Sequence, residues 1–343
     1  MIAAYALNNG RLEKLPLGPG GEPPATALWF DLLSPTREEE AAVQRLTAVE
    51  VPTREEMQEI EVSSRLYREG DAHYLTAPII HQTDTPRAEV TPVTFILTPK
   101  ALITVRYATP RSVEFFVARA ARQAGWCSTP ETVLLGLLET IVDRVADVME
   151  RVAAELDATS RRIFFDPAGN NGEQKAVEPK TEEQTNADLQ AVLRQLGRAG
   201  DLTTKTRDTI LGLDRVATYI IAAETLGVSR ETKPRLKTLT RDTRSLAEHD
   251  GFLSNKVNFL LDATLGMISI GQNRSITQQN NIIKIFTVAA TAFLPPTLVA
   301  SIYGMNFKIL PELNWEYGYL WALGLMVISA VVPFLFFKHR GWL

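Results

Sequence analysis

The run IFTVAATAFLPPTLVASIY, residues 285–303, holds 19 residues without a charge and leads directly into Gly304, Met305 and Asn306. A second uncharged run of 21 residues covers 317–337. An α-helix needs about 20 apolar residues to cross a hydrocarbon core about 30 Å thick. Neither run lies at the N-terminus, where a signal peptide would be. The sequence therefore predicts two transmembrane helices, and the alternative is two buried helices of a large soluble protein.

Charge separates the 343 residues into two parts. Residues 281–343 carry four basic and two acidic residues, a net of +2, and because the whole chain carries −4, residues 1–280 carry −6. An acidic soluble part argues against a nucleic-acid partner. Lys284 precedes the first run and a basic stretch, 338–340, follows the second. The positive-inside rule then predicts that both termini are cytoplasmic and that the short connection faces outside. The sole cysteine, Cys127, excludes an intrachain disulfide.

The first part of the chain has the pattern of an α/β domain. Alternating or apolar runs predict strands at 2–7, 27–33, 73–81, 90–97 and 101–107. Helices are expected at 39–49, 53–60 and 112–123, the first after the capping signal Ser34-Pro35-Thr36. Thr98-Pro99-Lys100 predicts a hairpin between the last two strands.

Strands disappear after residue 129. An amphipathic pattern predicts one helix at 132–164, a polar loop follows at 165–183, and a second helix is expected at 185–225. From about Arg230 no strong helix breaker occurs before Pro295, which predicts a helix of about 70 residues, or roughly 105 Å at 1.5 Å per residue. A helix of that length needs partners along its sides, either the preceding helices, other copies of the chain, or both.

The predicted fold class is an α+β cytoplasmic domain, built as an α/β sandwich, followed by a long stalk helix and two C-terminal transmembrane helices. The predicted division is the α/β domain at 1–128, long cytoplasmic helices at 129–228, the stalk helix at 229–284, the first transmembrane helix at 285–303, an external loop at 304–316, the second transmembrane helix at 317–337 and a basic tail at 338–343.

Two transmembrane helices cannot enclose a water-filled path, so a pore requires several copies of the chain around an axis. The first transmembrane helix is the better lining helix, because polar side chains recur there every three or four residues. The pattern includes Asn280, Ile283, Thr287, Thr291 or Ala290, Leu294, Thr297 and Ser301. Hydroxyl groups also serve plain helix packing, which stays an alternative for Thr287, Thr291 and Ser301.

Asn306 lies just past the end of the first transmembrane helix. Mg²⁺ holds its water tightly in an octahedral oxygen shell. A ring of neutral amide oxygens accepts hydrogen bonds from that water, and it binds weakly enough for the ion to leave. Gly304 permits a tight backbone where copies converge. Met305 is expected to pack, because thioether sulfur is a poor ligand for a hard cation.

In this setting the tripeptide Gly304-Met305-Asn306 resembles the signature of the CorA family of magnesium and cobalt transporters, which lies between two C-terminal transmembrane helices. The similarity also covers 282–286, 293–301, 303–307, 311–313 and the closing 336–343. Upstream of these segments the agreement is in architecture only.

The resemblance implies a funnel-shaped homopentamer in the inner membrane that carries Mg²⁺ and Co²⁺, with Ni²⁺ as a further candidate. Its partners would be membrane lipid and divalent cations. By position, Gly304, Met305 and Asn306 form the selectivity filter. The remaining positions carried over are Thr297 and Asn280 as polar pore rings, and Leu294, Phe286 and Ile283 as hydrophobic constrictions that gate by excluding water.

The family also closes when Mg²⁺ binds acidic residues between cytoplasmic domains, so Mg²⁺ is expected as substrate and as regulatory ligand, with no other cofactor. Asp242, Glu248 and Asp250 are the candidate sensing residues in this sequence. The alternative is that these carboxylates only solvate an exposed helix face.

Two other functions stay open. A zinc transporter on the same scaffold shares the tripeptide, although the four histidines are scattered through the sequence. A membrane-anchored signalling or scaffold protein would use the two helices only as tethers. An enzyme is not expected, because the sequence has no phosphate-binding glycine loop, no metal-ligand spacing and no nucleophile–histidine pairing.

Overall fold

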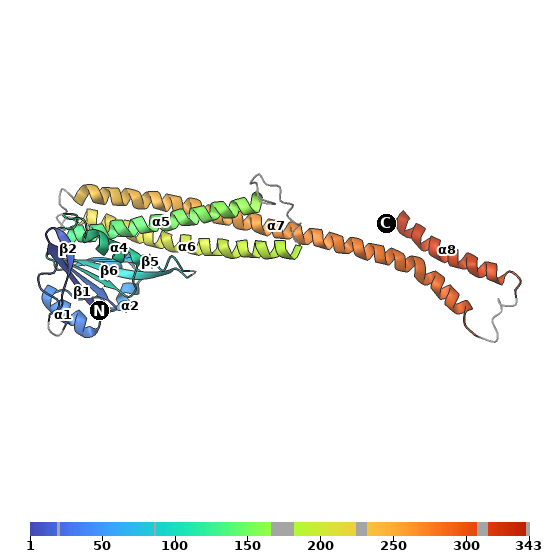
Figure 1. The fold of residues 1–343 in the computed structure, drawn as a ribbon, viewed down its shortest axis with the longest axis horizontal. Coiled ribbons are helices and arrows are strands. Elements are labelled where there is room, and N and C mark those ends of the chain that lie inside the picture. The colour runs from blue at the N-terminus through green and yellow to red at the C-terminus, as the bar shows by residue number, and fades with distance from the viewer. Residues whose placement is uncertain (19–20, 86, 166–181, 224–231, 307–314, 341–343) are drawn as a thin grey trace. The chain divides into compact units, whose positions relative to one another are not determined.

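The computed structural model describes residues 1–18, 21–85, 87–165, 182–223, 232–306 and 315–340. Its elements are β1 (Ile2–Asn8), β2 (Arg11–Leu15), β3 (Trp29–Leu33), α1 (Arg37–Thr47), α2 (Arg54–Gln58), α3 (Val62–Arg65), β4 (Leu66–Glu69), β5 (Ala72–His81), β6 (Glu89–Leu97), β7 (Leu102–Arg106), α4 (Arg111–Ala120), α5 (Pro130–Phe164), α6 (Glu182–Ala222), α7 (Thr232–Tyr303) and α8 (Gly318–His339) (Figure 1). The chain forms two compact units, Met1–Thr264 and Leu265–Leu343. Helix α7 contributes residues to both units.

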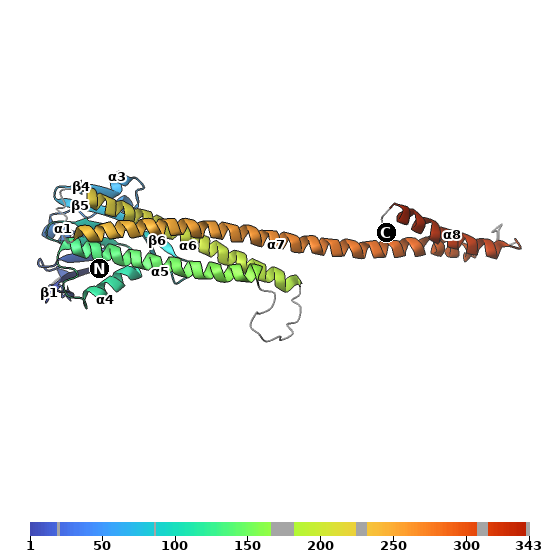
Figure 2. The same ribbon diagram turned by 90° about the horizontal axis from the view of Figure 1, so that it is seen from above.

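One mixed seven-stranded sheet organises the first unit, in the order β2-β1-β3-β7-β6-β5-β4. Neighbouring strands are antiparallel except β3 and β7, which are parallel. One face of the sheet packs Trp29 and Phe95 into a cluster with Phe116 of α4 and Leu138 of α5. Helices α1 and α2 cover the other face (Figure 1), and Figure 2 shows α4 and α5 next to each other on the first face. The predicted α/β sandwich is therefore confirmed.

The five predicted strands and the hairpin at 98–100 are confirmed, and the capping signals explain where the helices begin. Thr36 and Thr53 each form a capping box, with Glu39 and Glu56 respectively. The prediction missed β2 and β4, which lie at the two edges of the sheet. Both are short and rich in charged residues, a composition that protects sheet edges but hides strands from a hydrophobicity pattern.

A buried ion pair joins the two parallel strands. Arg106 of β7 donates from Nε and Nη2 to the two carboxylate oxygens of Asp31 in β3, at 2.9 and 2.8 Å. Thr104 adds a hydrogen bond to Asp31 at 2.7 Å, and the Trp29 indole donates to Thr104 at 3.1 Å. Because a buried charge is costly unless it is fully hydrogen-bonded, this network fixes the register in which β3 and β7 pair.

The predicted long helices are also present in the first unit. Helix α5 starts at Pro130 after the Thr129 cap, and α5, α6 and the first part of α7 share an apolar cluster that includes Val145, Leu196 and Leu253. The predicted loop at 165–183 and the break at 227–229 lie almost wholly outside the described residues. Helix α7 has 72 residues, which corresponds to about 108 Å at 1.5 Å per residue. This agrees with the length predicted from the missing helix breakers.

Helix α6 approaches strand β5 closely at Gly212. A Cβ atom at Gly212 would lie 2.5 Å from Cδ of Pro78, whose ring is held in the strand. Nearby, the Thr209 hydroxyl accepts a hydrogen bond from the Ile80 backbone N–H at 3.0 Å. The missing side chain at Gly212 therefore sets the distance between helix and sheet.

We expect Gly212→Ala to destabilise the protein. Overpacking of this kind costs about 1–3 kcal/mol, which outweighs the gain of about 1 kcal/mol from replacing glycine in a helix. Gly197 is the matched control, since it lies exposed on the same helix with open space around its Cβ position. Thermal unfolding of the full-length protein should show a lower midpoint for Gly212→Ala only; equal or higher midpoints for both variants would contradict the close packing at Gly212.

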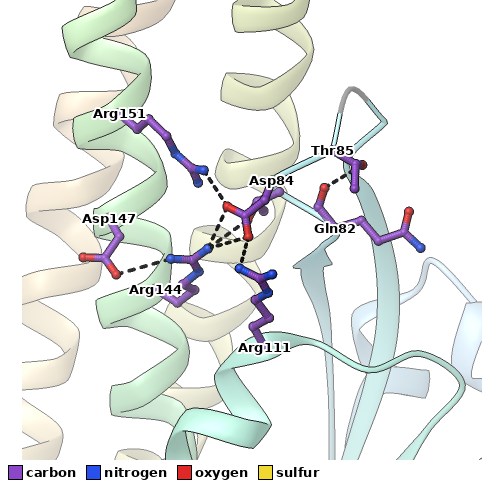
Figure 3. A network of polar contacts seen from close by, with 8 residues as sticks. Gln82, Asp84, Thr85, Arg111, Arg144, Asp147 and Arg151 are labelled. Atoms are coloured by element: carbon purple, nitrogen blue, oxygen red, sulfur yellow. Dashed lines mark hydrogen bonds and ion pairs between the residues drawn. The ribbon is translucent and has the colours of Figure 1, made fainter.

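A cluster of charges holds the turn between β5 and β6 to the helices (Figure 3). The Asp84 carboxylate pairs with Arg111 at the start of α4, with Arg144 at 3.1 Å and with Arg151 at 2.6 Å. Asp147, one turn along α5, also pairs with Arg144 at 3.6 Å. The hydrogen bond from Arg151 is the main cause that holds the pKa of Asp84 below its ordinary value. One carboxylate therefore ties three segments together.

Asp84→Asn should lower the free energy of unfolding by about 1.5–3 kcal/mol, the usual contribution of hydrogen bonds to charged groups. Because the folded pKa is lowered, this stabilisation is present at neutral pH and is lost as pH falls below about 4. Asp71→Asn is the control, since Asp71 is 87 % exposed and has one ion pair, at 3.6 Å. Denaturation followed at pH 7 and pH 3 tests this, and an equal loss at both pH values would refute it.

Candidate functional site

The second unit contains residues 265–303 of α7 and helix α8. Both helices contain an 18-residue stretch apolar enough to cross a membrane. None of that stretch in α7 is buried, and only 6 % of it in α8 is buried. Helices from a soluble core would be mostly covered by protein, so this exposure argues for the membrane and against the soluble alternative. Helix α8 has Trp315, Tyr317 and Trp321 near its start and Lys338 in its last turn, the flanks typical of a transmembrane helix.

The seven predicted pore-lining residues all lie on α7. At about 100° per residue on a regular helix, they fall within an arc of about 120°, which we call the path face. Its members are Asn280, Ile283, Phe286, Thr287, Leu294, Thr297 and Ser301. All seven side chains are exposed in the single chain, with Phe286 at 71 % and Leu294 at 67 %. The path face is therefore free to meet other copies of the chain, or water.

The threonine hydroxyls on the path face donate their protons back to the helix. Thr287 donates to the Ile283 carbonyl at 2.7 Å, and Thr297 donates to the Phe293 carbonyl at 2.6 Å. A hydroxyl whose proton is used in this way offers only lone pairs to its surroundings. Such a group accepts hydrogen bonds from the water around a cation, and it does not present a donor to the ion.

Two prolines lie inside the helix at the middle of its apolar stretch. Pro295 and Pro296 have no N–H, so the carbonyl groups of Thr291 and Ala292 lose their usual helical donors. Prolines inside a helix commonly bend it, yet α7 is one continuous helix from Thr232 to Tyr303.

Helix α7 ends at Tyr303, and Gly304 is the first residue after it. Its N–H donates to the Ala300 carbonyl at 2.9 Å, and a Cβ atom there would lie 3.1 Å from that same oxygen. The Met305 N–H donates to the Ile302 carbonyl at 3.2 Å. Asn306 follows outside the helix with an exposed side chain. The end of the helix therefore leaves an amide free to face water, and residues 307–314 of the predicted external loop lie outside the described residues.

The three candidate sensing carboxylates lie on the first part of α7 in different surroundings. Asp242 is 49 % exposed and pairs with Arg241 at 3.7 Å, and Glu248 is exposed. Asp250 is fully buried and accepts a hydrogen bond from the Thr206 hydroxyl at 3.2 Å. Its second oxygen has no hydrogen-bond partner among the described residues. Burial raises the pKa of Asp250.

No sequence pattern singles out Asp143 of α5, yet it lies close enough to Asp242 for their charges to interact. Burial is the main cause that raises the pKa of Asp143, and Glu139, Asp147 and Asp242 raise it further. The packing of α5 beside α7 brings these carboxylates together. Their spacing along the sequence does not predict that they lie close to one another. Within the part of the chain that the structure describes, no group of three His, Cys, Asp or Glu side chains is arranged to hold a metal.

Comparison with known proteins agrees with this arrangement. A family model described as "CorA-like Mg2+ transporter protein" matches residues 24–339. The chain belongs to this family. Magnesium transport protein CorA of Yersinia pseudotuberculosis serotype I (strain IP32953) is 33 % identical over 343 residues, and that of Escherichia coli (strain K12) is 31 % identical. Both alignments cover 100 % of each chain.

Solved structures share the CorA fold at low sequence identity. The complete CorA magnesium transporter of Methanocaldococcus jannaschii matches with a TM-score of 0.61 and 16 % identity, over 100 % of this chain and 99 % of that one. The cytoplasmic domain of ZntB from Vibrio parahaemolyticus RIMD 2210633 matches with a TM-score of 0.53 and 11 % identity, over 78 % of this chain and 97 % of that one. The predicted fold class and family are thereby confirmed, and the protein is a membrane transporter of the CorA family.

Asp250→Asn tests the buried carboxylate. Because the folded pKa is raised, an ionised Asp250 destabilises the fold, and the effect sets in as pH rises above about 4. Asparagine keeps an acceptor for Thr206 without the charge. The variant should therefore gain stability over the wild type as pH rises from about 4, up to about 1–2 kcal/mol, and the difference should level off once Asp250 is ionised in the folded state.

Unfolding midpoints of the full-length protein across this pH range measure the difference. Asp262→Asn, at an exposed aspartate on the same helix, is the control and should show a smaller change in this difference across the pH range. A stability difference for Asp250→Asn that shrinks as pH rises would contradict a raised pKa for the buried carboxyl.

Proposed function

We propose that the chain is one subunit of a homo-oligomeric channel that carries Mg²⁺ into the cell, with Co²⁺ as a second substrate and Ni²⁺ as a weaker candidate. The observation that carries the proposal is the position of Asn306. It follows Gly304 at the end of an uncharged, exposed segment of α7, in which the Thr287 and Thr297 hydroxyls offer only acceptors. Membership of a family of Mg²⁺ transporters supports the choice of ion.

Selection would act on the hydrated ion. Mg²⁺ exchanges its water reluctantly, so a filter of Gly304, Met305 and Asn306 recognises the ion together with its shell. The amide oxygen of Asn306 accepts hydrogen bonds from that shell, while Gly304 lets the copies approach closely. Neutral oxygens hold a divalent cation less tightly than carboxylates, which favours release and conduction.

Further along the path, Asn280 and Thr297 would form polar rings, and Ile283, Phe286 and Leu294 would form hydrophobic constrictions. Narrow apolar rings close a pore by excluding water, without any plug. This arrangement of alternating polar and apolar rings suits a gated path.

Several copies are needed because one chain has too few transmembrane helices to enclose water. Apolar side chains left exposed on α7 support assembly, among them Phe252 and Phe259, each 60 % exposed. We propose a homopentamer, the state that the family resemblance implies. Basic residues beside both transmembrane helices support cytoplasmic termini in an inner membrane, with Asn306 on the outer side.

Cytoplasmic Mg²⁺ would close the path by bridging carboxylates of neighbouring subunits. Asp242 and Glu248 are available at the surface, and Asp143 adds a carboxylate near Asp242. Asp250 would join such a site only after α6 and α7 separate, because its side chain is fully buried. Mg²⁺ would then serve as both substrate and regulator.

Mg²⁺ uptake into proteoliposomes tests the proposal directly. Asn306→Ala removes hydrogen bonds worth about 1.5–3 kcal/mol each when a charge is involved, so uptake should fall at least about tenfold. Asn255→Ala, an exposed asparagine on the same helix but far from the filter, is the matched control and should leave uptake unchanged.

The same assay separates the alternatives. Parallel uptake of Zn²⁺, Co²⁺ and Ni²⁺ should show Mg²⁺ carried at the highest rate under equal gradients; faster Zn²⁺ uptake would favour the zinc transporter. A scaffold protein would carry no ion, either as the wild type or as Asn306→Ala. Undiminished Mg²⁺ uptake by Asn306→Ala would reject the role of the filter.

A further inference from the structure

The cytoplasmic segment of α7 that precedes the apolar stretch is almost free of charge. Between Asp262 and Lys284 the only charged residue is Arg274. Six amide side chains crowd into ten positions of this segment: Gln272, Asn273, Gln278, Gln279, Asn280 and Asn281. All six are exposed, so folding of the single chain does not use them. An uncharged amide-rich helix surface in the cytoplasm is unusual, because surfaces there are ordinarily charged.

The regular helix determines which of these amides share the path face. Each residue of a regular helix is rotated by about 100° around the helix axis relative to the one before it. On this count the angle around the axis between the centre of the path face and Gln272 is about 20°, whereas for Gln278 it is about 140°. Arg274 falls about 180° from the centre and Lys284 about 100°. The two cations therefore lie off the path face, and an amide lies near its centre.

We infer that Gln272 forms a second ring of amides in the cytoplasmic half of the ion path. The inference rests on the proposed function and adds a specificity-determining residue to it. Gln272 precedes Asn280 by eight residues, which is about 12 Å along the helix. A hydrated cation that leaves the Asn280 ring meets a further set of neutral acceptors at that distance.

The chemistry of the side chain suits this position. Glutamine presents a carbonyl oxygen on a flexible stem, so several copies adjust around a hydrated ion of fixed size. It holds the ion weakly, because it carries no charge, and weak sites in series favour conduction. The placement of Arg274 on the opposite side of the helix fits the same role, because a ring of guanidinium groups on the path face would repel a divalent cation.

Modification of introduced thiols tests the inference, because the wild-type protein has no accessible cysteine that would also react. Its sole cysteine, Cys127, is 2 % exposed, and burial raises its pKa to about 12, so the wild type should not react. Gln272→Cys and Gln278→Cys place the same thiol on and off the path face. The reagent is 2-(trimethylammonium)ethyl methanethiosulfonate, added to the cytoplasmic side of proteoliposomes during Mg²⁺ uptake.

Modification of Gln272→Cys should reduce Mg²⁺ uptake at least tenfold, whereas modified Gln278→Cys should keep the rate of its untreated form. Mass spectrometry confirms that both thiols have reacted. Full uptake by modified Gln272→Cys, or equal block of both variants, would overturn the assignment. Where a cysteine variant fails to assemble, Gln272→Lys and Gln278→Lys replace the pair, and only the first should lose uptake.

These outcomes are distinct from failure of the proposed function. A wild type that carries no Mg²⁺ rejects the channel itself, and Gln272 with it. A wild type that carries Mg²⁺, together with loss of uptake in Asn306→Ala but not in modified Gln272→Cys, keeps the channel and rejects the second ring.

Discussion

The constraint that governs this protein is the exclusion of charge from the hydrocarbon core. A charged side chain at mid-membrane depth costs several kcal/mol, so the stretches of α7 and α8 that cross the membrane contain none. The backbone satisfies its own hydrogen bonds by forming helices, which is the only option for an isolated segment in lipid. A polar path for an ion must then be built from hydroxyls, amides and carbonyl groups, and these are the groups that α7 presents.

Helix α7 links the membrane part of the chain to the part that contains the sheet. Helix α7 is one continuous element of 72 residues, so its first half belongs to a bundle with α5 and α6 while its second half supplies the path face. The bundle is anchored to the sheet at Gly212 and Pro78 and through the Asp84 cluster. In the proposed channel, a cation bound to carboxylates on the bundle would act on the same helix that would line the path, which would give a physical route for regulation.

Sequence patterns predicted most of this architecture because the strongest signals are long and periodic. The uncharged runs, the absence of helix breakers after Arg230 and the Thr36 cap each depend on residues close in sequence. The Asp31–Arg106 pair, the burial of Asp250 and the proximity of Asp143 to Asp242 depend on tertiary packing, because the residues involved lie 44, 75 and 99 positions apart in the sequence. Strands β2 and β4 escaped prediction because sheet edges favour charged residues. The pore-lining set and the sensing carboxylates stay predictions, since both require neighbouring copies of the chain.

The voltage dependence of Mg²⁺ flux tests the central claim most directly. An open path carries a divalent cation without a compensating charge, and each elementary charge gains about 2.3 kcal/mol per 100 mV. Proteoliposomes with a defined K⁺ diffusion potential and an internal Mg²⁺ indicator should therefore take up Mg²⁺ faster as the inside becomes more negative. Uptake that does not respond to the potential, at an unchanged Mg²⁺ gradient, would contradict the account of this chain as an ion channel.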